Sequence, residues 1–266
     1  EISECLVGSE MCIRDRVLIM AIEKVIHQIW DGDNVPFQLR ILSCTWKRFN
    51  PNWEYHLWNK KEMVELVDSY FPEWANLYHS LPFNIQRLDM IRYMILYCHG
   101  GVYVDLDIEC FKSIDPLVEN KSFFLGMEPP EHWVCFNGSK QRVVGNAFMG
   151  SSNNHKGWLR ILSDIDFTVK NRIYRDDIVL NTTGPYMLSR LINQLRDEYG
   201  ASTLSSYLVS PVCKEDFQNY RKGVGSDLFY GKIKNAFCAH YFFGAWDKKL
   251  SVYKKNDNTD GTESFI

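Results

Sequence analysis

The part of this sequence that most constrains the fold is the stretch Asn84–Glu109, NIQRLDMIRYMILYCHGGVYVDLDIE. Apolar residues recur at helical spacing through its first half, and a Gly-Gly pair then precedes a short run in which apolar residues alternate with acids. The glycines permit positive φ angles and therefore a sharp turn between a helix that ends near His99 and the strand that follows. A helix that turns into an apolar strand is typical of an α/β protein, in which helices cover a sheet.

The predicted strand VYVDLDI carries two acidic side chains on one face. Because strand side chains alternate with a period of two, Asp105 and Asp107 are expected to point the same way, opposite to the apolar face. Two carboxylates on one face repel each other, and a divalent cation bound through oxygen atoms can offset that repulsion. The pattern Asp-x-Asp is common by chance, but here it lies near the C-terminal end of a strand, where open α/β sheets bind ligands.

The preceding helix carries a second pair of charges. Asp89 and Arg92 are three residues apart and can share one edge of the helix. An ordinary ion pair worth about 0.2–0.5 kcal/mol is the alternative to a functional role. Helical spacing predicts that the core face of this helix carries Leu88, Ile91, Ile95 and Cys98.

Composition limits the class of protein. The 266 residues are 45% hydrophobic and 14% aromatic, which suits one α/β domain with a sizeable core. The formal net charge of −3 gives no broad basic field, so nucleic acid is not expected as a partner. Eight cysteines without a C-x-x-C pair or zinc-like spacing favour reduced, mostly buried thiols.

The sequence also bears on location and on the ends of the chain. It contains no apolar run of about eighteen residues or more, so we expect a cytoplasmic protein. Peripheral association with the inner face of the membrane, or an anchor in a longer chain, stays open. Residues 1–19 lack a helical or strand period, and CLVGSEMCIRDR within them resembles a translated sequencing adapter. A signal peptide is the alternative, but the charges of this segment and its missing apolar core argue against it. We therefore expect the native protein to begin at Met20, a domain over 20–253 and a frayed polar tail over 254–266.

The remaining chain predicts alternating strands and helices over a largely parallel sheet. The predicted strands are Lys24–Trp30, Trp53–Trp58, Ser122–Glu128 and Val143–Ser151, with late strands near Thr203–Val212 and Lys234–Tyr241. The predicted helices are Pro36–Arg48, Lys60–Tyr70, Lys156–Lys170 and Gly184–Tyr199. In the last of these, Thr183 is the predicted N-cap and Pro185 lies in the first turn.

Four ordered sequence blocks resemble a known family. IHQIW, LDMIRYMILYCHGGVYVDLD, TTGPYML and AHYFFGAW together resemble glycosyltransferase family 32, whose sugar-binding region contains a DXD motif. Its members include yeast-type initiating mannosyltransferases, bacterial capsule and oligosaccharide transferases, and the catalytic domain of glucosylating toxins. The resemblance runs from about Lys24 to about Lys248. It implies a GT-A-type fold, a single Rossmann-like nucleotide-sugar-binding domain with a largely parallel central sheet flanked by helices.

The resemblance also implies roles for the charged residues. Asp89 and Arg92 match a D-x-x-R pair that contacts donor sugar hydroxyls and the sugar-phosphate region, for which the planar guanidinium fork is well suited. Asp105 would bind ribose and sugar hydroxyls and reach the metal through water. Asp107 would ligate Mn²⁺ or Mg²⁺ directly, and the cation would bridge the donor diphosphate.

Other residues take roles from the same resemblance, each with an ordinary structural alternative. Trp30, at the end of the first strand, would stack on the nucleotide base, or else is a core tryptophan. Asn146 would lie near the reaction centre, or else is a turn residue. His240 would complete the metal sphere, and Trp246 would close over the donor. Ala245 stands where the family usually has serine, which leaves more of the metal contact to His240 and Asp107.

The expected function is metal-dependent transfer of a hexose from a nucleotide sugar to a glycan or lipid-linked saccharide, with retention of configuration. A UDP-hexose donor is favoured over GDP-mannose, and the oligomeric state is not predicted. Two alternatives stay open. An aspartyl-nucleophile phosphatase would use Asp105 as nucleophile and Asp107 as acid/base, although Glu109 stands where that class has Thr or Val. The protein could also be a non-catalytic carbohydrate-binding protein on a transferase fold.

Overall fold

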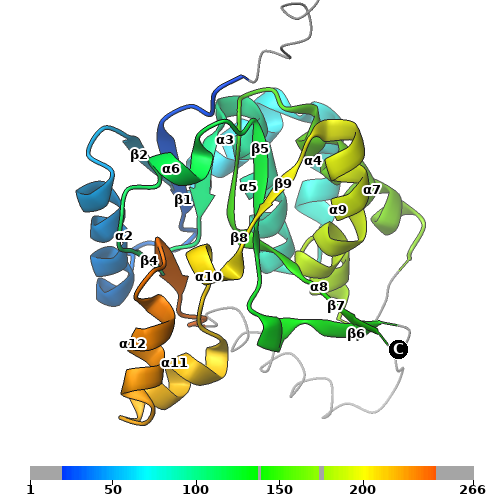
Figure 1. Ribbon diagram of the computed structural model, residues 1–266. Coiled ribbons are helices and arrows are strands. Elements are labelled where there is room, and N and C mark those ends of the chain that lie inside the picture. The colour runs from blue at the N-terminus through cyan, green and yellow to red at the C-terminus, as the bar shows by residue number, and fades with distance from the viewer. Residues whose placement is uncertain (1–19, 137–138, 174–176, 244–266) are drawn as a thin grey trace, which may run out of the picture.

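The computed structural model describes residues 20–136, 139–173 and 177–243, which fold around one six-stranded sheet (Figure 1). The expectations for 1–19 and for the tail 254–266 lie outside these residues. In spatial order the sheet contains β2 (Glu54–Trp58), β1 (Val25–Ile29), β3 (Gly101–Val104), β8 (Val144–Ser151), β5 (Phe123–Met127) and β9 (Ser202–Leu204). β1 is parallel to β2 and β3, and β5 is parallel to β9, whereas β8 runs antiparallel to both of its neighbours. The predicted α/β class is confirmed, with β8 as the antiparallel exception.

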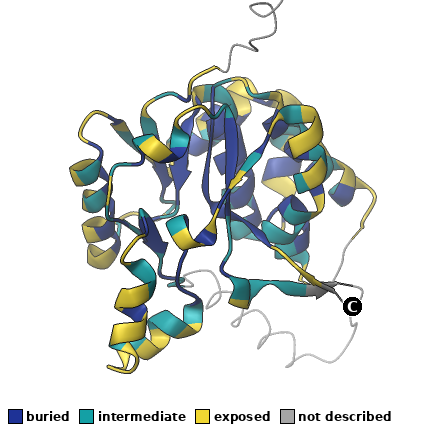
Figure 2. Ribbon diagram, viewed as in Figure 1, coloured by how far each residue is buried: buried dark blue, intermediate teal, exposed yellow. Residues whose placement is uncertain are grey.

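Two layers cover the sheet, and their residues form two hydrophobic clusters. One face packs against α3 (Lys60–Tyr70), α4 (Pro72–Ser80), α5 (Asn84–His99), α7 (Lys156–Lys170) and α9 (Pro185–Tyr199). The other face packs against α2 (Phe37–Phe49), α6 (Asp115–Val118), α10 (Ser206–Val209) and the short strand β4 (Ile108–Cys110). Figure 2 shows the central strands almost entirely buried between these layers.

α5 is buried around nearly its whole circumference, although its sequence reads as amphipathic. Its position explains this, because the helix packs on the sheet strands β1, β3 and β8 and is covered in turn by α3, α4, α7 and α8 (Ile178–Thr182). Of its predicted core face, Ile91 and Ile95 are fully buried, and Leu88 and Cys98 are partly buried. The charges of Asp89 and Arg92 are therefore buried too.

The Gly-Gly turn after α5 has the predicted left-handed geometry. Gly100 and Gly101 have φ angles of +64° and +81°. A Cβ atom on Gly101 would lie 2.4 Å from the carbonyl oxygen of Val25 in the neighbouring strand. Only glycine therefore lets β3 start against β1 at this point.

The prediction of one strand through the two aspartates is wrong. β3 ends at Val104, and residues 105–107 form a turn in which the Ile108 amide donates to the Asp105 carbonyl oxygen at 3.2 Å. The chain then continues as β4, which pairs antiparallel with β10 (Cys238–His240) in a separate two-stranded sheet. The aspartates thus flank a turn instead of sharing the face of one strand.

The late strand predictions are also wrong in part. β9 ends at Leu204 and α10 follows it, and β10 keeps only three residues of the range Lys234–Tyr241. The sequence reasoning missed several short elements: α8 (Ile178–Thr182), α11 (Lys214–Arg221), α12 (Ser226–Ile233), the 3-10 turn Pro130–His132 and the hairpin of β6 (Val134–Phe136) and β7 (Ser139–Gln141). It also missed α4 and α6. Such short segments show too few turns for their period to stand out.

Two general expectations can be checked on the described residues. The cysteines Cys44, Cys98, Cys110, Cys213 and Cys238 are free, and the last three are buried. Cys5 and Cys12 lie outside the described ranges. Among the helices that the structure describes, none combines the length and the apolar character needed to cross a bilayer.

Candidate active site

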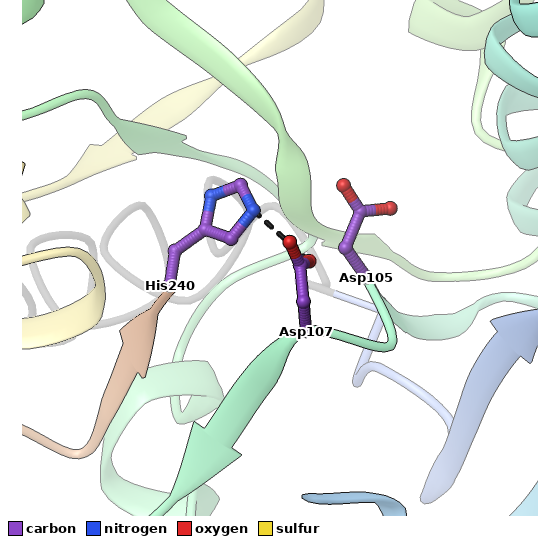
Figure 3. A group of neighbouring side chains, drawn as sticks. All are labelled: Asp105, Asp107 and His240. Carbon is purple, nitrogen blue, oxygen red and sulfur yellow. Dashed lines mark ion pairs between the residues drawn. The ribbon is translucent and has the colours of Figure 1, made fainter. Parts of the chain in front are cut away.

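Three predicted metal ligands meet where β3, β4 and β10 converge. One ligand atom from each of Asp105, Asp107 and His240 lies within 4.8 Å of the other two. Asp105 and Asp107 project from the turn after β3, and His240 projects from the end of β10 (Figure 3). The Nε2 atom of His240 lies 3.0 Å from Oδ1 of Asp107. Residues more than 130 positions apart in the sequence thus form one cluster.

The backbone around Asp107 fixes the direction of its carboxylate. The Phe243 amide donates to Oδ2 at 2.9 Å, and the Tyr241 amide donates to the Asp107 carbonyl oxygen at 3.0 Å. In the β4–β10 pair His240 lies opposite Ile108, next to Asp107. The pairing of β4 with β10 therefore positions these two predicted ligands.

The charges of this pair stabilise each other. Burial lowers the pKa of His240, but the adjacent Asp107 carboxylate outweighs burial and raises that pKa to about 9. Burial also acts to raise the pKa of Asp107, but His240 and the Phe243 amide keep it below its ordinary value. The second ring nitrogen of His240, Nδ1, is buried without a hydrogen-bond partner among the described residues.

This donor set fits a divalent cation. Two carboxylates and one imidazole are ligands that Mn²⁺ accepts, and the oxygen atoms also suit Mg²⁺. The three side chains are only partly exposed, with 23%, 17% and 12% of the surfaces of Asp105, Asp107 and His240 accessible. A second group, Glu131, Cys213 and Asp216, fits less well, because the ammonium group of Lys232 already contacts both carboxylates.

Asp105 belongs to the cluster with Asp107 and His240, and it also contacts Arg92 of the charged pair on α5. The Tyr103 hydroxyl donates to its Oδ1 at 2.7 Å, and Nη1 of Arg92 lies 3.2 Å from the same oxygen. Burial raises the pKa of Asp105, an effect that Arg92 opposes and Asp107 adds to. Gln28 on β1 donates to the Asp105 carbonyl oxygen at 3.2 Å. The sequence reasoning did not identify Tyr103 or Gln28 as neighbours of Asp105.

The pair Asp89 and Arg92 is a buried ion pair and not an ordinary surface one. Nη2 of Arg92 lies 3.3 Å from Oδ1 of Asp89, and each side chain is only 6% exposed. Burial acts to lower the pKa of Arg92, but the carboxylates of Asp105 and Asp89 outweigh it, and the guanidinium stays charged. Burial raises the pKa of Asp89 to about 6, although Arg92 opposes this shift. Buried charges of this kind require good partners, and both have them.

Two polar side chains from other elements complete the environment of Asp89. Asn146, near the start of β8, donates from Nδ2 to Oδ1 at 2.8 Å. Thr183 donates from Oγ1 to Oδ2 at 2.9 Å, and its carbonyl oxygen accepts from the Tyr93 hydroxyl at 2.6 Å. The prediction that Thr183 is the N-cap of the next helix is wrong, because Gly184 occupies that position. The block TTGPYML was the only sequence signal for this residue.

Of the two tryptophans with predicted roles in donor binding, the structure describes only Trp30. Trp30 directly follows β1 and packs against a third hydrophobic cluster that contains Leu106, the residue between the two aspartates. Its indole Nε1 is buried without a hydrogen-bond partner among the described residues. Its role as a base-stacking residue stays a prediction. Trp246 and Ala245 lie outside the described residues.

Known proteins resemble this chain in both sequence and structure. Residues 36–124 match the family model described as "Glycosyltransferase sugar-binding region containing DXD motif". Inositol phosphoceramide mannosyltransferase 3 of Schizosaccharomyces pombe is 30% identical over 64% of this chain and 44% of its own length. Mannosyl phosphorylinositol ceramide synthase SUR1 of Saccharomyces cerevisiae is 27% identical over 66% and 43%. The matches thus span less than half of these two relatives.

Solved structures support the fold. The PaToxG glycosyltransferase superposes with a TM-score of 0.51 at 20% identity, covering 65% of this chain and 69% of that one. The ligand-free glycosyltransferase domain of the YGT toxin gives 0.50 at 10% identity, covering 69% and 80%. At such identities the likeness concerns the fold, and it confirms the predicted GT-A-type architecture. The family match includes Asp89, Arg92, Asp105 and Asp107. Residues 36–124 thus match the glycosyltransferase sugar-binding region that contains the DXD motif, and of the four sequence blocks this range includes LDMIRYMILYCHGGVYVDLD.

Proposed function

We propose that this protein is a metal-dependent, retaining glycosyltransferase that moves a hexose from a nucleotide sugar to a glycan or lipid-linked saccharide. The observation that carries the proposal is the convergence of Asp105, Asp107 and His240 within 4.8 Å, joined through Arg92 to the buried pair on α5. The side chains that would hold a cation are thus in direct contact with the polar groups that would bind the sugar.

The cation would be held by carboxylate oxygens of Asp107 and Asp105 and by Nε2 of His240. Bound Mn²⁺ or Mg²⁺ would neutralise the negative charge that develops on the departing diphosphate. The turn after β3 and the β4–β10 pair fix the directions of these side chains before any ligand arrives. Such preorganisation favours catalysis because little reorganisation remains during the reaction.

Arg92 would act mainly by holding the side chains around it in place. Its Nη1 donates to the Asn146 carbonyl oxygen at 3.0 Å, and its Nε donates to the Leu88 carbonyl oxygen at 3.1 Å. With these contacts and the two carboxylates, the guanidinium holds Asp89 and Asp105 at a fixed separation. Its positive charge would also attract the donor diphosphate, as the D-x-x-R resemblance implies.

The proposal also concerns which sugar is transferred and which acceptor receives it. One of the two yeast relatives is named an inositol phosphoceramide mannosyltransferase, and the other a mannosyl phosphorylinositol ceramide synthase. The likeness to these relatives supports testing GDP-mannose beside UDP-hexoses as the donor, and a glycolipid beside a glycan as the acceptor. Retention would follow from attack on the same face of the sugar, with the leaving diphosphate accepting the proton of the acceptor hydroxyl. A product of inverted configuration would contradict this step.

The test is release of nucleoside diphosphate from a panel of UDP- and GDP-sugars, with and without Mn²⁺. We compare the full chain with Asp107→Asn, and with Asp166→Asn as a matched control, because Asp166 pairs with Lys170 on α7. We expect metal-dependent release from one donor, a loss of at least about 100-fold in Asp107→Asn, and no change in the control. Hydrolysis of simple phosphate esters without release from any donor would instead support the phosphatase alternative. Donor binding without turnover would support the carbohydrate-binding one.

A further inference from the structure

His240 lines a small cavity whose other lining residues lie outside the cluster of Asp105, Asp107 and His240. The cavity has a volume of about 10 Å³, which is close to the minimum that holds a single water-sized oxygen atom. Its polar lining comes from four separate parts of the chain: Glu128 after β5, Gly145 on β8, Ser210 after α10 and His240 at the end of β10. Ile108 and Phe148 are among its apolar walls.

Two polar atoms of residues that line this cavity lack hydrogen-bond partners. Oγ of Ser210 and Nδ1 of His240 are both buried and unpaired among the described residues. The Ser210 residue as a whole is only 7% exposed. Buried polar groups are nearly always hydrogen-bonded in folded proteins, so two unpaired ones at one cavity indicate that a polar group of a ligand can bind there.

Glu128 adds a partly buried acceptor to the same wall. Its side chain is 12% exposed, and its Oε2 lies 2.9 Å from Nδ1 of His132, the only ion-pair partner that it has among the residues described. A Cβ atom on Gly145 would lie 2.4 Å from Oε1 of Glu128, so the glycine leaves the space that this carboxylate occupies. A carboxylate at this position favours a neutral hydrogen-bond donor and disfavours a phosphate group.

We propose that this cavity is a subsite that binds one hydroxyl group of a sugar beside the metal centre. The inference rests on the proposed function. If Nε2 of His240 ligates the cation, then Nδ1 carries the proton and must donate it. A sugar hydroxyl can accept from Nδ1 and donate to Glu128 at the same time, and Ser210 can supply a third contact. The hydroxyl belongs either to the transferred hexose or to the acceptor saccharide.

The test compares Ser210→Ala and Glu128→Gln with two matched controls, Ser163→Ala on the exposed face of α7 and Glu131→Gln, whose native carboxylate pairs with Lys232. Calorimetry with Mn²⁺ measures the affinities for UDP and GDP and for UDP-glucose, UDP-galactose and GDP-mannose. Turnover of the preferred donor is then measured against methyl α-mannoside and methyl α-glucoside as acceptors. Melting temperatures within about 2 °C of the wild type show that each variant folds.

We expect both site variants to keep the wild-type affinity for the nucleoside diphosphate, and both controls to change nothing. A loss of at least about tenfold in nucleotide-sugar affinity assigns the hydroxyl to the donor hexose. A tenfold rise in KM for the methyl glycoside, with donor affinity intact, assigns it to the acceptor. Site variants that match the wild type in both measurements overturn the subsite and leave the proposed function intact. A wild-type chain that binds none of the nucleotides overturns the proposed function, and the subsite with it.

Discussion

The hydrogen bond from Thr183 to Asp89 offers the sharpest test of the buried network. In Thr183→Val the side chain keeps its shape and loses only the hydroxyl that donates to Oδ2 at 2.9 Å. Thr183 is fully buried, so no water replaces the lost donor. A hydrogen bond to a charged group contributes about 1.5–3 kcal/mol, and we expect the free energy of unfolding at pH 7.5 to fall by about 2 kcal/mol. For a domain of this size, that loss lowers Tm by about 4–8 °C.

The loss should depend on pH, because the hydroxyl stabilises the ionised form of Asp89. Burial raises the pKa of Asp89 from its ordinary 3.8 to about 6 in the folded protein. Between these two pKa values the folded state therefore keeps a proton on Asp89 that the unfolded chain has released. The protonated Asp89 favours the folded state at low pH, and this contribution to the free energy of unfolding is lost as the pH rises through about 6. At pH 5 Asp89 is mostly protonated and depends less on the donor. We expect the effect of Thr183→Val to fall below about 1 kcal/mol there.

Urea unfolding of the wild type, Thr183→Val and Thr183→Ser at pH 5.0 and 7.5 measures these differences. Thr183→Ser keeps the hydroxyl and removes a methyl group, so its cost of about 1 kcal/mol should be the same at both pH values. A valine variant as stable as the wild type at pH 7.5, or one whose loss does not change with pH, would refute the reasoning about Asp89.

Two further predictions concern the backbone that positions the site. Gly101→Ala should destabilise the protein by about 3 kcal/mol or more, because the new Cβ would lie 2.4 Å from the Val25 carbonyl oxygen at a φ of +81°. Gly223→Ala is the control, because Gly223 has a similar φ of +76° but an added Cβ atom would have no neighbour within 4 Å, so it should cost about 1 kcal/mol. Equal losses of unfolding free energy in the two variants, measured by denaturant unfolding, would contradict the role of the close approach at Gly101. Asn59→Ala should cost about 1 kcal/mol of thermal stability, since it breaks the capping box with Glu62 at the start of α3, while nucleoside diphosphate release stays unchanged.

The sequence alone determined the elements whose signals are local. The apolar period of α5, the Gly-Gly pair and the apolar run of β8 each depend on neighbours within a few residues, and their positions agree with the structure to within a residue or two. The same holds for the candidate residues of the site. Asp105, Asp107 and His240 were chosen from a two-residue spacing and a family resemblance, and the fold brings them together.

Only the tertiary structure decided how these residues are arranged. The turn that separates Asp105 from Asp107 exists because β4 leaves the main sheet to pair with β10, a strand some 130 residues later. Thr183 contacts Asp89 across 94 positions, and Arg92 reaches the Asn146 carbonyl oxygen across 54. Periodicity and capping describe interactions within one turn of helix or one strand. Contacts between distant segments depend on how the buried layers pack. That packing brings Asp105 and Asp107, predicted on one strand face, together with His240, and makes Thr183, predicted as a helix cap, a partner of the buried Asp89 carboxylate.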